Sequence, residues 1–116
     1  MSYQNNMSKD MTANNLTPYI ATHPGEVLKD ELEFRGISQR QFSKQLGISY
    51  SLLNEVLNGK RPVNTELALL IEAALGIDAE PLLNMQTRYN LQKAKENSSF
   101  FERLKSIGKV AAMFSL

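Results

Sequence analysis

The chain has 116 residues, no cysteine and a formal net charge of +1. This length suits one compact domain with tails, and the lack of cysteine excludes a disulfide framework and any thiolate metal site. Hydrophobic residues make up 42% of the chain, yet no apolar run reaches the roughly 18 residues of a membrane span. The N-terminus shows no apolar core of a secretory signal, so the cytoplasm is the expected location.

The charges are unevenly distributed along the chain. Residues 26–35 are acidic, because four carboxylates stand against Lys29 and Arg35. Residues 37–63 are basic, because Glu55 is the sole acidic residue against Arg40, Lys44, Lys60 and Arg61. The net charge neither requires nor forbids a nucleic-acid partner, but the basic stretch is compatible with one.

The first part of the chain divides into an arm and a first helix. Residues 1–20 are rich in Asn, Ser and Thr without helical period, which predicts a flexible N-terminal arm. A helix then begins with His23 as a cap and Pro24 at the first helical position, where the missing N–H has no cost. Gly36 ends this helix. Its expected apolar stripe is Val27, Leu28, Leu32 and Phe34.

Two short helices follow around a glycine. The first is predicted over residues 39–46, where Ser38 and Gln41 form a capping box. Gly47 ends it, because glycine tolerates the positive φ of a tight turn. The second is predicted over residues 50–57 and ends at the pair Asn58-Gly59.

The remaining sequence predicts three more helices. Asn64 or Thr65 caps one that ends at Gly76, and Asp78 caps the next, so the helical domain spans residues 21–96. Residues 97–116 form a C-terminal amphipathic helix with apolar positions at Phe100, Phe101, Leu104, Ile107, Ala111 and Phe114. The predicted fold is therefore all-α, a compact five-helix bundle plus this amphipathic helix.

The apolar face of the terminal helix needs a partner, because a stripe of this size is a liability when exposed. We expect it to fold back on the bundle or to pair in a dimer. Docking into the groove of another protein is the next alternative, and binding to a membrane surface is the least favoured.

The pair of helices around Gly47 has the pattern of a helix-turn-helix. Ile48 is expected to turn inward, and Phe42, Leu53 and Val56 to meet where the helices cross. In this motif the second helix lies in the major groove and its N-terminal residues meet base edges. The outward face is expected to carry Ser49, Tyr50, Ser51, Asn54 and Glu55, while Gln39, Ser49, Lys60 and Arg61 would hold the DNA backbone on either side. The alternative is a small core helix whose polar side only faces water.

The stretch from about residue 22 to residue 96 resembles the HigA-type antitoxins within the Xre/Cro-like, lambda-repressor-like helix-turn-helix family. The resemblance rests on HPGE followed by leucine two residues later, on ISQRQFSKQLGIS, and on LNGKRPVNTELALLIEAALG. It implies a homodimeric repressor that binds a palindromic operator and neutralises a RelE-like toxin, an endonuclease of translated mRNA. By position, the DNA-facing residues would be the same eight: Gln39, Ser49, Tyr50, Ser51, Asn54, Glu55, Lys60 and Arg61.

Two residues depart from the family pattern. Glu55 stands where a neutral or basic residue is usual; its carboxylate would repel phosphate, although it could accept a hydrogen bond from cytosine. Ser43 stands where a small apolar residue is usual, and it can be satisfied by bonding the carbonyl one turn back.

Other functions find less support in the sequence. A protein-interaction module with weak DNA binding, or a repressor without a toxin, stays open as an alternative. No nucleophile–base set, phosphate loop or carboxylate dyad is visible, so we expect neither an enzyme nor a cofactor. His23 is the single histidine and has no clustered partners, so no metal site is expected.

Overall fold

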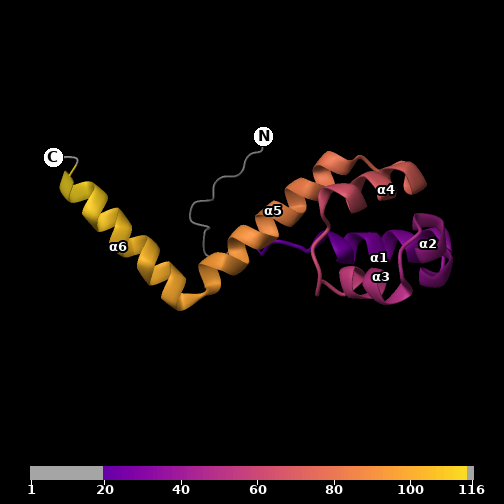
Figure 1. The fold of residues 1–116 in the computed structure, drawn as a ribbon, viewed down its shortest axis with the longest axis horizontal. Helices are drawn as coiled ribbons and strands as arrows, with labels where there is room; N and C mark the ends of the chain where they lie inside the picture. Colours follow the sequence, from indigo (N-terminus) through magenta and orange to yellow (C-terminus); the bar gives the residue numbers. More distant parts are fainter. Residues whose placement is uncertain (1–19, 115–116) are drawn as a thin grey trace, which may run out of the picture.

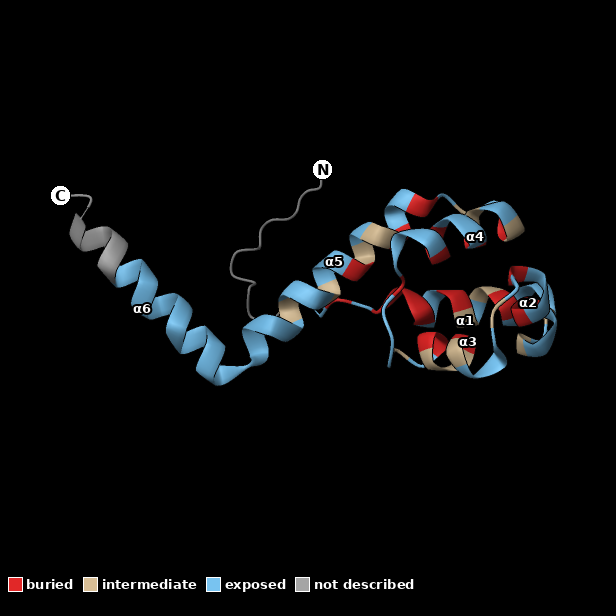
Figure 2. Cartoon of the chain, viewed as in Figure 1, coloured by how far each residue is buried: buried red, intermediate tan, exposed pale blue. Residues whose placement is uncertain are grey.

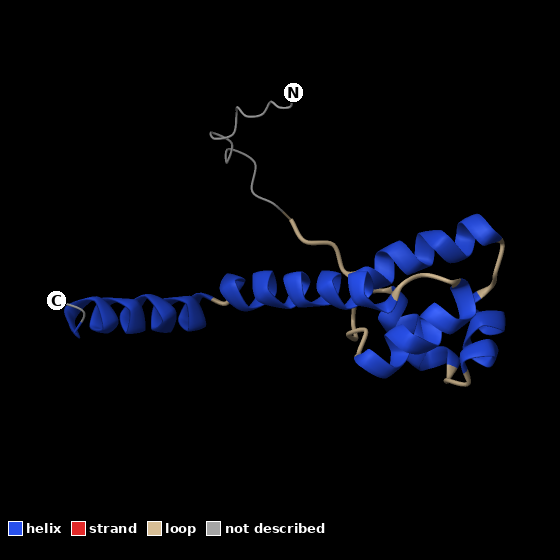
Figure 3. Cartoon of the chain, turned by 90° about the horizontal axis from the view of Figure 1, so that it is seen from above, coloured by secondary structure: helices blue, strands red, loops and turns tan. Residues whose placement is uncertain are grey.

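The computed structural model describes residues 20–114, which form six α-helices and no strand (Figures 1 and 3). The helices are α1 (Pro24–Arg35), α2 (Gln39–Leu46), α3 (Tyr50–Leu57), α4 (Thr65–Leu75), α5 (Ala79–Glu96) and α6 (Ser98–Phe114). The predicted all-α class is confirmed. Except for residue 20, the predicted N-terminal arm lies outside the described residues.

The expected compact bundle of five helices needs correction. Helices α1–α4 pack with the first part of α5, whereas the rest of α5 and all of α6 extend from the bundle as an arm (Figure 1). The radius of gyration is 19.0 Å, against roughly 13 Å for a compact domain of about this size. The reason is that α5 is 18 residues long, which exceeds the width of a bundle built from helices of eight to twelve residues.

The core lies where α1–α4 meet the start of α5, and Figure 2 shows the buried residues concentrated there. Leucine side chains dominate this core, with Phe42 as its largest member. Burial of such side chains contributes roughly 1.5–3 kcal/mol each before entropy is counted. The buried apolar residues of the helices are Leu28, Leu32, Phe42, Leu46, Leu53, Val56, Leu57, Leu67, Ala68, Ile71, Leu75, Ala79 and Leu82.

The first helix begins at a buried cap. The Gly25 backbone N–H donates to Nδ1 of His23 at 2.9 Å, and Pro24 occupies the first turn as predicted. The histidine is 2% exposed, and its ring meets Tyr89 of α5 edge-on at 4.9 Å between centroids. The prediction that His23 is a cap is therefore confirmed, and the same ring also joins α1 to α5.

The apolar stripe expected on α1 is half wrong. Leu28 and Leu32 are buried, but Val27 is exposed and the Phe34 side chain is 88% exposed. Only the side of a helix that packs against other helices is buried. Helix α1 packs against α3 and α5 on one side, so residues on its other side stay exposed. Its outward side thus carries two unpartnered apolar side chains among carboxylates.

The arm is formed by a single-residue joint between two helices. Asn97 is the C-cap of α5, and its side-chain oxygen accepts from the Phe100 backbone N–H of α6 at 3.0 Å. Helix α6 points away from the bundle in both ribbon views (Figures 1 and 3), so the expectation that it folds back on the bundle is wrong. No helix in residues 20–114 has both the length and the hydropathy that a membrane crossing requires.

The buried cap makes the stability depend on pH. Burial lowers the pKa of His23 from its ordinary value of 6.5, although a hydrogen bond with the Arg61 backbone and the charge of Glu26 oppose this shift. As the pH falls below 6.5, the unfolded chain takes up a proton that the folded chain refuses, so the free energy of unfolding decreases. The stabilisation from the neutral, buried His23 is fully present above pH 6.5, the pKa in the unfolded chain. It is lost progressively as the pH falls from 6.5 to the lower pKa of the folded chain.

This dependence can be measured by urea unfolding of the wild type and of His23→Asn between pH 7.5 and 5. Asparagine keeps an oxygen acceptor for the cap but does not titrate. We expect the wild type to lose stability relative to the variant below pH 6.5, with a slope of at most about 1.4 kcal/mol per pH unit. A constant difference between the two proteins over this range would contradict the assignment.

Candidate nucleic-acid interface

The helix-turn-helix forms at the predicted residues, and local bonds explain why. The Ser38–Gln41 capping box starts α2, and Gly47 ends it with φ at 73°. The Ile48 backbone N–H then donates to the Ser43 carbonyl at 3.0 Å, which completes the turn. These interactions join residues at most five positions apart, so the local sequence is sufficient to specify the turn.

The inner side of the motif is held by the core. Phe42 of α2 and Leu53 and Val56 of α3 are fully buried, and Ile48 packs against them from the turn. Ser43 is also buried, and its hydroxyl donates to the Arg40 carbonyl at 2.9 Å. The predicted way of satisfying this serine is thus confirmed, and α3 is left with only its polar side facing outward.

Three amides form a chain across that outward side. The Asn54 side-chain nitrogen donates to Oε1 of Gln39 at 3.0 Å, and its oxygen accepts from the Asn58 side chain at 3.2 Å. Each amide group has two donors and two acceptor positions, so Asn54 keeps one of each. One free donor and one free acceptor are what bidentate pairing with adenine requires. The structure brings Gln39 and Asn54 together, which sequence spacing did not suggest.

The N-terminal end of α3 carries the smaller predicted residues and an aromatic ring. Ser49 is the N-cap, and its hydroxyl oxygen accepts from the Leu52 backbone N–H at 3.0 Å, while Ser51 is exposed. The guanidinium of Arg40 lies over the Tyr50 ring, 4.7 Å from its centroid. This cation–π contact orders an arginine beside α3, and it adds Arg40 to the candidate residues.

The C-terminal end of α3 contains an ion pair between two predicted residues. Glu55 Oε1 accepts from both Nε and Nη2 of Arg61 at 2.9 Å. Gly59, with φ at 74°, turns the chain back so that these side chains meet. The neighbouring Lys60 side chain is exposed, and it makes no salt bridge with any residue from 20 to 114. The positive charge of Arg61 therefore offsets the negative charge of Glu55. The same pair leaves the Arg61 guanidinium less available to a phosphate.

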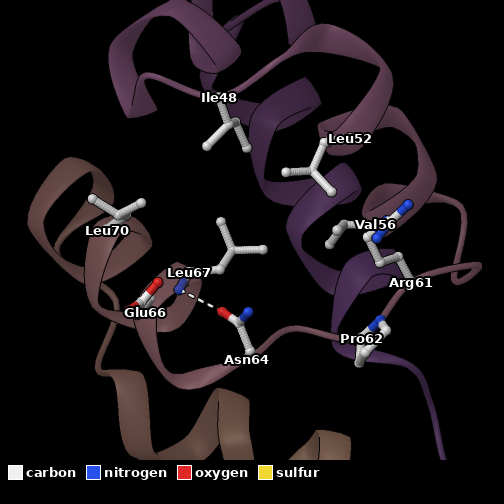
Figure 4. Close-up of a pocket in the computed structure, with 9 residues that line it drawn as sticks. All are labelled: Ile48, Leu52, Val56, Arg61, Pro62, Asn64, Glu66, Leu67 and Leu70. Atoms are coloured by element: carbon white, nitrogen blue, oxygen red, sulfur yellow. Dashed lines mark hydrogen bonds between the residues drawn. The ribbon is translucent and has the colours of Figure 1, made fainter.

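A groove of about 350 Å³ lies beside this surface, between α3 and α4 (Figure 4). Its walls are largely apolar, and Asn64 at its edge caps α4 by accepting from the Leu67 backbone N–H at 2.9 Å. An apolar lining offers few bonds to phosphate or to base edges, so the outward side of α3 is the candidate nucleic-acid interface, with Arg61 at the rim of the groove. The residues that line the groove are Ile48, Leu52, Val56, Arg61, Pro62, Asn64, Glu66, Leu67 and Leu70.

Comparison with known proteins agrees with this geometry. A helix-turn-helix family model matches residues 28–82. Virulence-associated protein I of Dichelobacter nodosus is 38% identical over 78 residues, which cover 66% of this chain and 72% of that protein. A solved addiction module antidote protein of the HigA family from Coxiella burnetii is 33% identical with a TM-score of 0.66, over 78% of this chain and 95% of that one. This chain belongs to the HigA family of Xre-like helix-turn-helix proteins.

A further HigA-family structure is the Pseudomonas aeruginosa antitoxin HigA with the higBA promoter. It is 27% identical with a TM-score of 0.65, over 72% of this chain and 92% of that one. The family is thus one of DNA-binding regulators with an antitoxin-like fold, and the helix-turn-helix of this chain lies within the matched region.

The loop after α3 is anchored from two sides in this HigA-family chain. Gln86 of α5 is buried, and its side-chain oxygen accepts from the Val63 backbone N–H at 2.8 Å. On the other side, His23 makes a hydrogen bond with the Arg61 backbone. Neither anchor was foreseen, because each joins residues far apart in the sequence. Together they position Lys60 and Arg61 relative to α3.

The ion pair at Glu55 leads to a specific prediction. Glu55→Gln removes the carboxylate and frees the guanidinium of Arg61, so we expect tighter binding to DNA of any sequence. An exposed pair of this kind is worth about 0.2–1 kcal/mol, which predicts a gain of roughly 1.4- to fivefold at low salt. Fluorescence anisotropy with two unrelated duplexes would measure it.

The result should be compared with Glu72→Gln, which makes the same charge change on α4. A gain for Glu72→Gln equal to that for Glu55→Gln would show an effect of net charge only. A loss confined to one duplex would instead show that Glu55 reads a base.

Proposed function

We propose that this chain is a sequence-specific repressor and the antitoxin of a type II toxin–antitoxin pair. In this proposal a homodimer binds a palindromic operator in its own promoter, with half-sites about one helical turn, roughly 34 Å, apart. The antitoxin role, neutralisation of a RelE-like mRNA endonuclease, rests on membership of the HigA family.

The observation that carries the DNA-binding part is the ordered Asn54 amide on the outward side of α3. Its bonds to Gln39 and Asn58 fix its orientation before DNA arrives, which lowers the entropy cost of binding. Tyr50 and Ser51 would lie beside it at the base edges. Ser49 keeps a hydroxyl proton for a phosphate oxygen, because its cap uses only the oxygen.

The proposal gives the remaining predicted residues a role at the DNA backbone. Gln39 lies at the first turn of α2, where free backbone N–H groups can bind phosphate. Lys60 and Arg61 supply two positive charges at the other end of α3. Glu55 modulates Arg61 in this arrangement rather than repelling phosphate by itself.

The repressor part is tested by a mobility shift of the wild-type protein on DNA upstream of its own gene. We expect a shift that weakens steeply between 50 and 200 mM salt, because phosphate contacts release counterions. No salt-dependent shift of this DNA, alongside a folded protein, would refute the repressor part. The antitoxin part has its own test, co-expression with the product of the adjacent gene, in which rescue of growth is expected.

The Glu55–Arg61 pair favours one alternative, a protein-interaction module with weak DNA binding. The two proposals differ in a measurable way. The module predicts a stable complex with the neighbouring gene product and similar, weak affinities for upstream and unrelated DNA.

A further inference from the structure

Two exposed helix faces in this chain share one residue spacing and carry opposite charges. On α1, Asp30 lies between Val27, three residues before it, and Phe34, four residues after it. On α6, Arg103 lies between Phe100 and Ile107 at the same two spacings. Because residues three and four apart are neighbours on a helix surface, each face is an apolar pair with one charge at its centre.

Both faces lack a partner in residues 20–114. The exposed fractions are 88% for Phe34 and 61% for Ile107, and Val27 and Phe100 are also exposed. Neither Asp30 nor Arg103 makes a salt bridge with a described residue. Exposed apolar faces flanked by charge are typical of protein–protein contacts.

The charges around the two faces are also complementary. Glu26 and Glu33 lie beside Asp30 on the outward side of α1, and both are exposed. On α6, Arg103 is the cation of the face, whereas Lys105 lies on another side of the helix and pairs with Glu102 at 3.3 Å. The α1 face is therefore acidic and the α6 face carries a cation at its centre, so each would attract the other and repel a second copy of itself.

The joint at Asn97 keeps these faces apart within one chain. Helix α6 starts one residue after α5 ends, and the Asn97 cap bonds the Phe100 backbone N–H at 3.0 Å. The described part of α6 is directed away from its own bundle and is exposed along its length, as Figure 2 shows. A helix of 17 residues is about 25 Å long, so α6 presents its face to another molecule.

We propose that α6 of one chain docks antiparallel on α1 of a second copy, and that the second copy reciprocates. Asp30 then faces Arg103 of the partner chain, with Val27 opposite Ile107 and Phe34 opposite Phe100. A two-fold axis makes each contact occur twice, which closes the dimer and doubles its stabilisation. This deepens the homodimer of the proposed function, on which it rests only for the two-fold symmetry of the operator.

The test uses two charge-reversal variants of the full chain without DNA. Asp30→Arg alone places two cations at each contact, and Arg103→Asp alone places two anions there. We expect each variant by itself to dissociate at least about tenfold more readily than the wild type in sedimentation equilibrium. Mixing the two variants restores an opposite pair at both contacts, so the mixture is expected to form heterodimers nearly as stable as the wild-type dimer.

Two further variants test the apolar part. Phe34→Asp, at a residue that is 88% exposed, should weaken the dimer, whereas Leu69→Asp, at an exposed leucine on α4, should leave it unchanged. Circular dichroism would verify that all variants fold.

Several outcomes would overturn the proposal. A wild-type protein that stays monomeric at 100 μM, or a monomer compact by small-angle scattering because α6 has folded back, would do so. A dimer that Asp30→Arg leaves unchanged, or a mixture of variants that stays monomeric, would place the interface elsewhere. These measurements contain no DNA, so they are separable from a failure of operator binding. Conversely, operator binding by a dimer that Asp30→Arg leaves intact would overturn this interface and still support the proposed function.

Discussion

Replacing both Lys60 and Arg61 with alanine is expected to weaken binding to every DNA sequence and to flatten its salt dependence. Each phosphate contact contributes about 0.9 to the slope of log affinity against log salt. Removing two contacts per half-site should therefore reduce that slope by about 2. The loss of affinity at 50 mM salt should then exceed the loss at 200 mM by roughly tenfold.

The structure explains why these two cations should act together. Their loop is held by His23 on one side and, through Val63, by Gln86 on the other. A pre-positioned loop loses little entropy on binding. The measurement is anisotropy on a single half-site duplex and on an unrelated duplex over a salt series.

A matched control is available on the arm. The double variant Lys93→Ala, Lys95→Ala removes the same charge. Both lysines lie near the C-terminal end of α5, away from α3. Equal losses for the two double variants would show that only net charge matters. A loss confined to the operator would show that the cations contact bases instead of phosphates.

Gly25→Ala is expected to cause the largest loss of stability among single substitutions outside the hydrophobic core. A Cβ at this position would lie 2.9 Å from the carbonyl carbon of Val56 and nearer still to its oxygen. It would also lie 2.9 Å from the His23 ring nitrogen that caps the helix. Backbone atoms cannot rotate away as a side chain can, so α1 and α3 must separate. Overpacking typically costs about 1–3 kcal/mol, and a clash with backbone atoms belongs at the upper end of that range, about 3 kcal/mol.

The effect is measured by thermal and urea unfolding. For a domain of this size, about 3 kcal/mol corresponds to a fall in Tm of roughly 12 °C or more. Gly108→Ala is the control, because a Cβ there meets nothing within 4 Å and alanine raises helix propensity by up to about 1 kcal/mol. Near-equal stability of Gly25→Ala and the wild type would contradict the close approach of α1 and α3.

In the proposed function, DNA reading depends on how the Asn54 amide and the Glu55–Arg61 pair behave together. The amide chain fixes a donor and an acceptor on the outward side of α3. The ion pair engages the neighbouring Glu55 carboxylate with Arg61, and both side chains stay exposed to solvent. Glu55 is engaged with Arg61, and in the proposed function its carboxylate competes with a DNA phosphate for that guanidinium.

The sequence by itself determined the helices of the motif and their ends. Residues 39–46 and 50–57 form α2 and α3 as predicted, and Ser38, Gly47 and Ser49 act as expected. The bond of Ser43 to the Arg40 carbonyl was also predictable. The physical reason is that each of these interactions joins groups within a few residues, so local sequence contains both partners.

Only the tertiary structure decided which surfaces meet and which stay free. The bond between Asn54 and Gln39 spans 15 residues, and that between Val63 and Gln86 spans 23. The helical period placed Phe34 on the apolar stripe, yet no neighbour among residues 20–114 covers it. It equally gave α6 an apolar side without showing that the helix leaves the bundle. Periodicity shows how one helix is divided between polar and apolar sides, whereas packing among several helices selects the side that is buried.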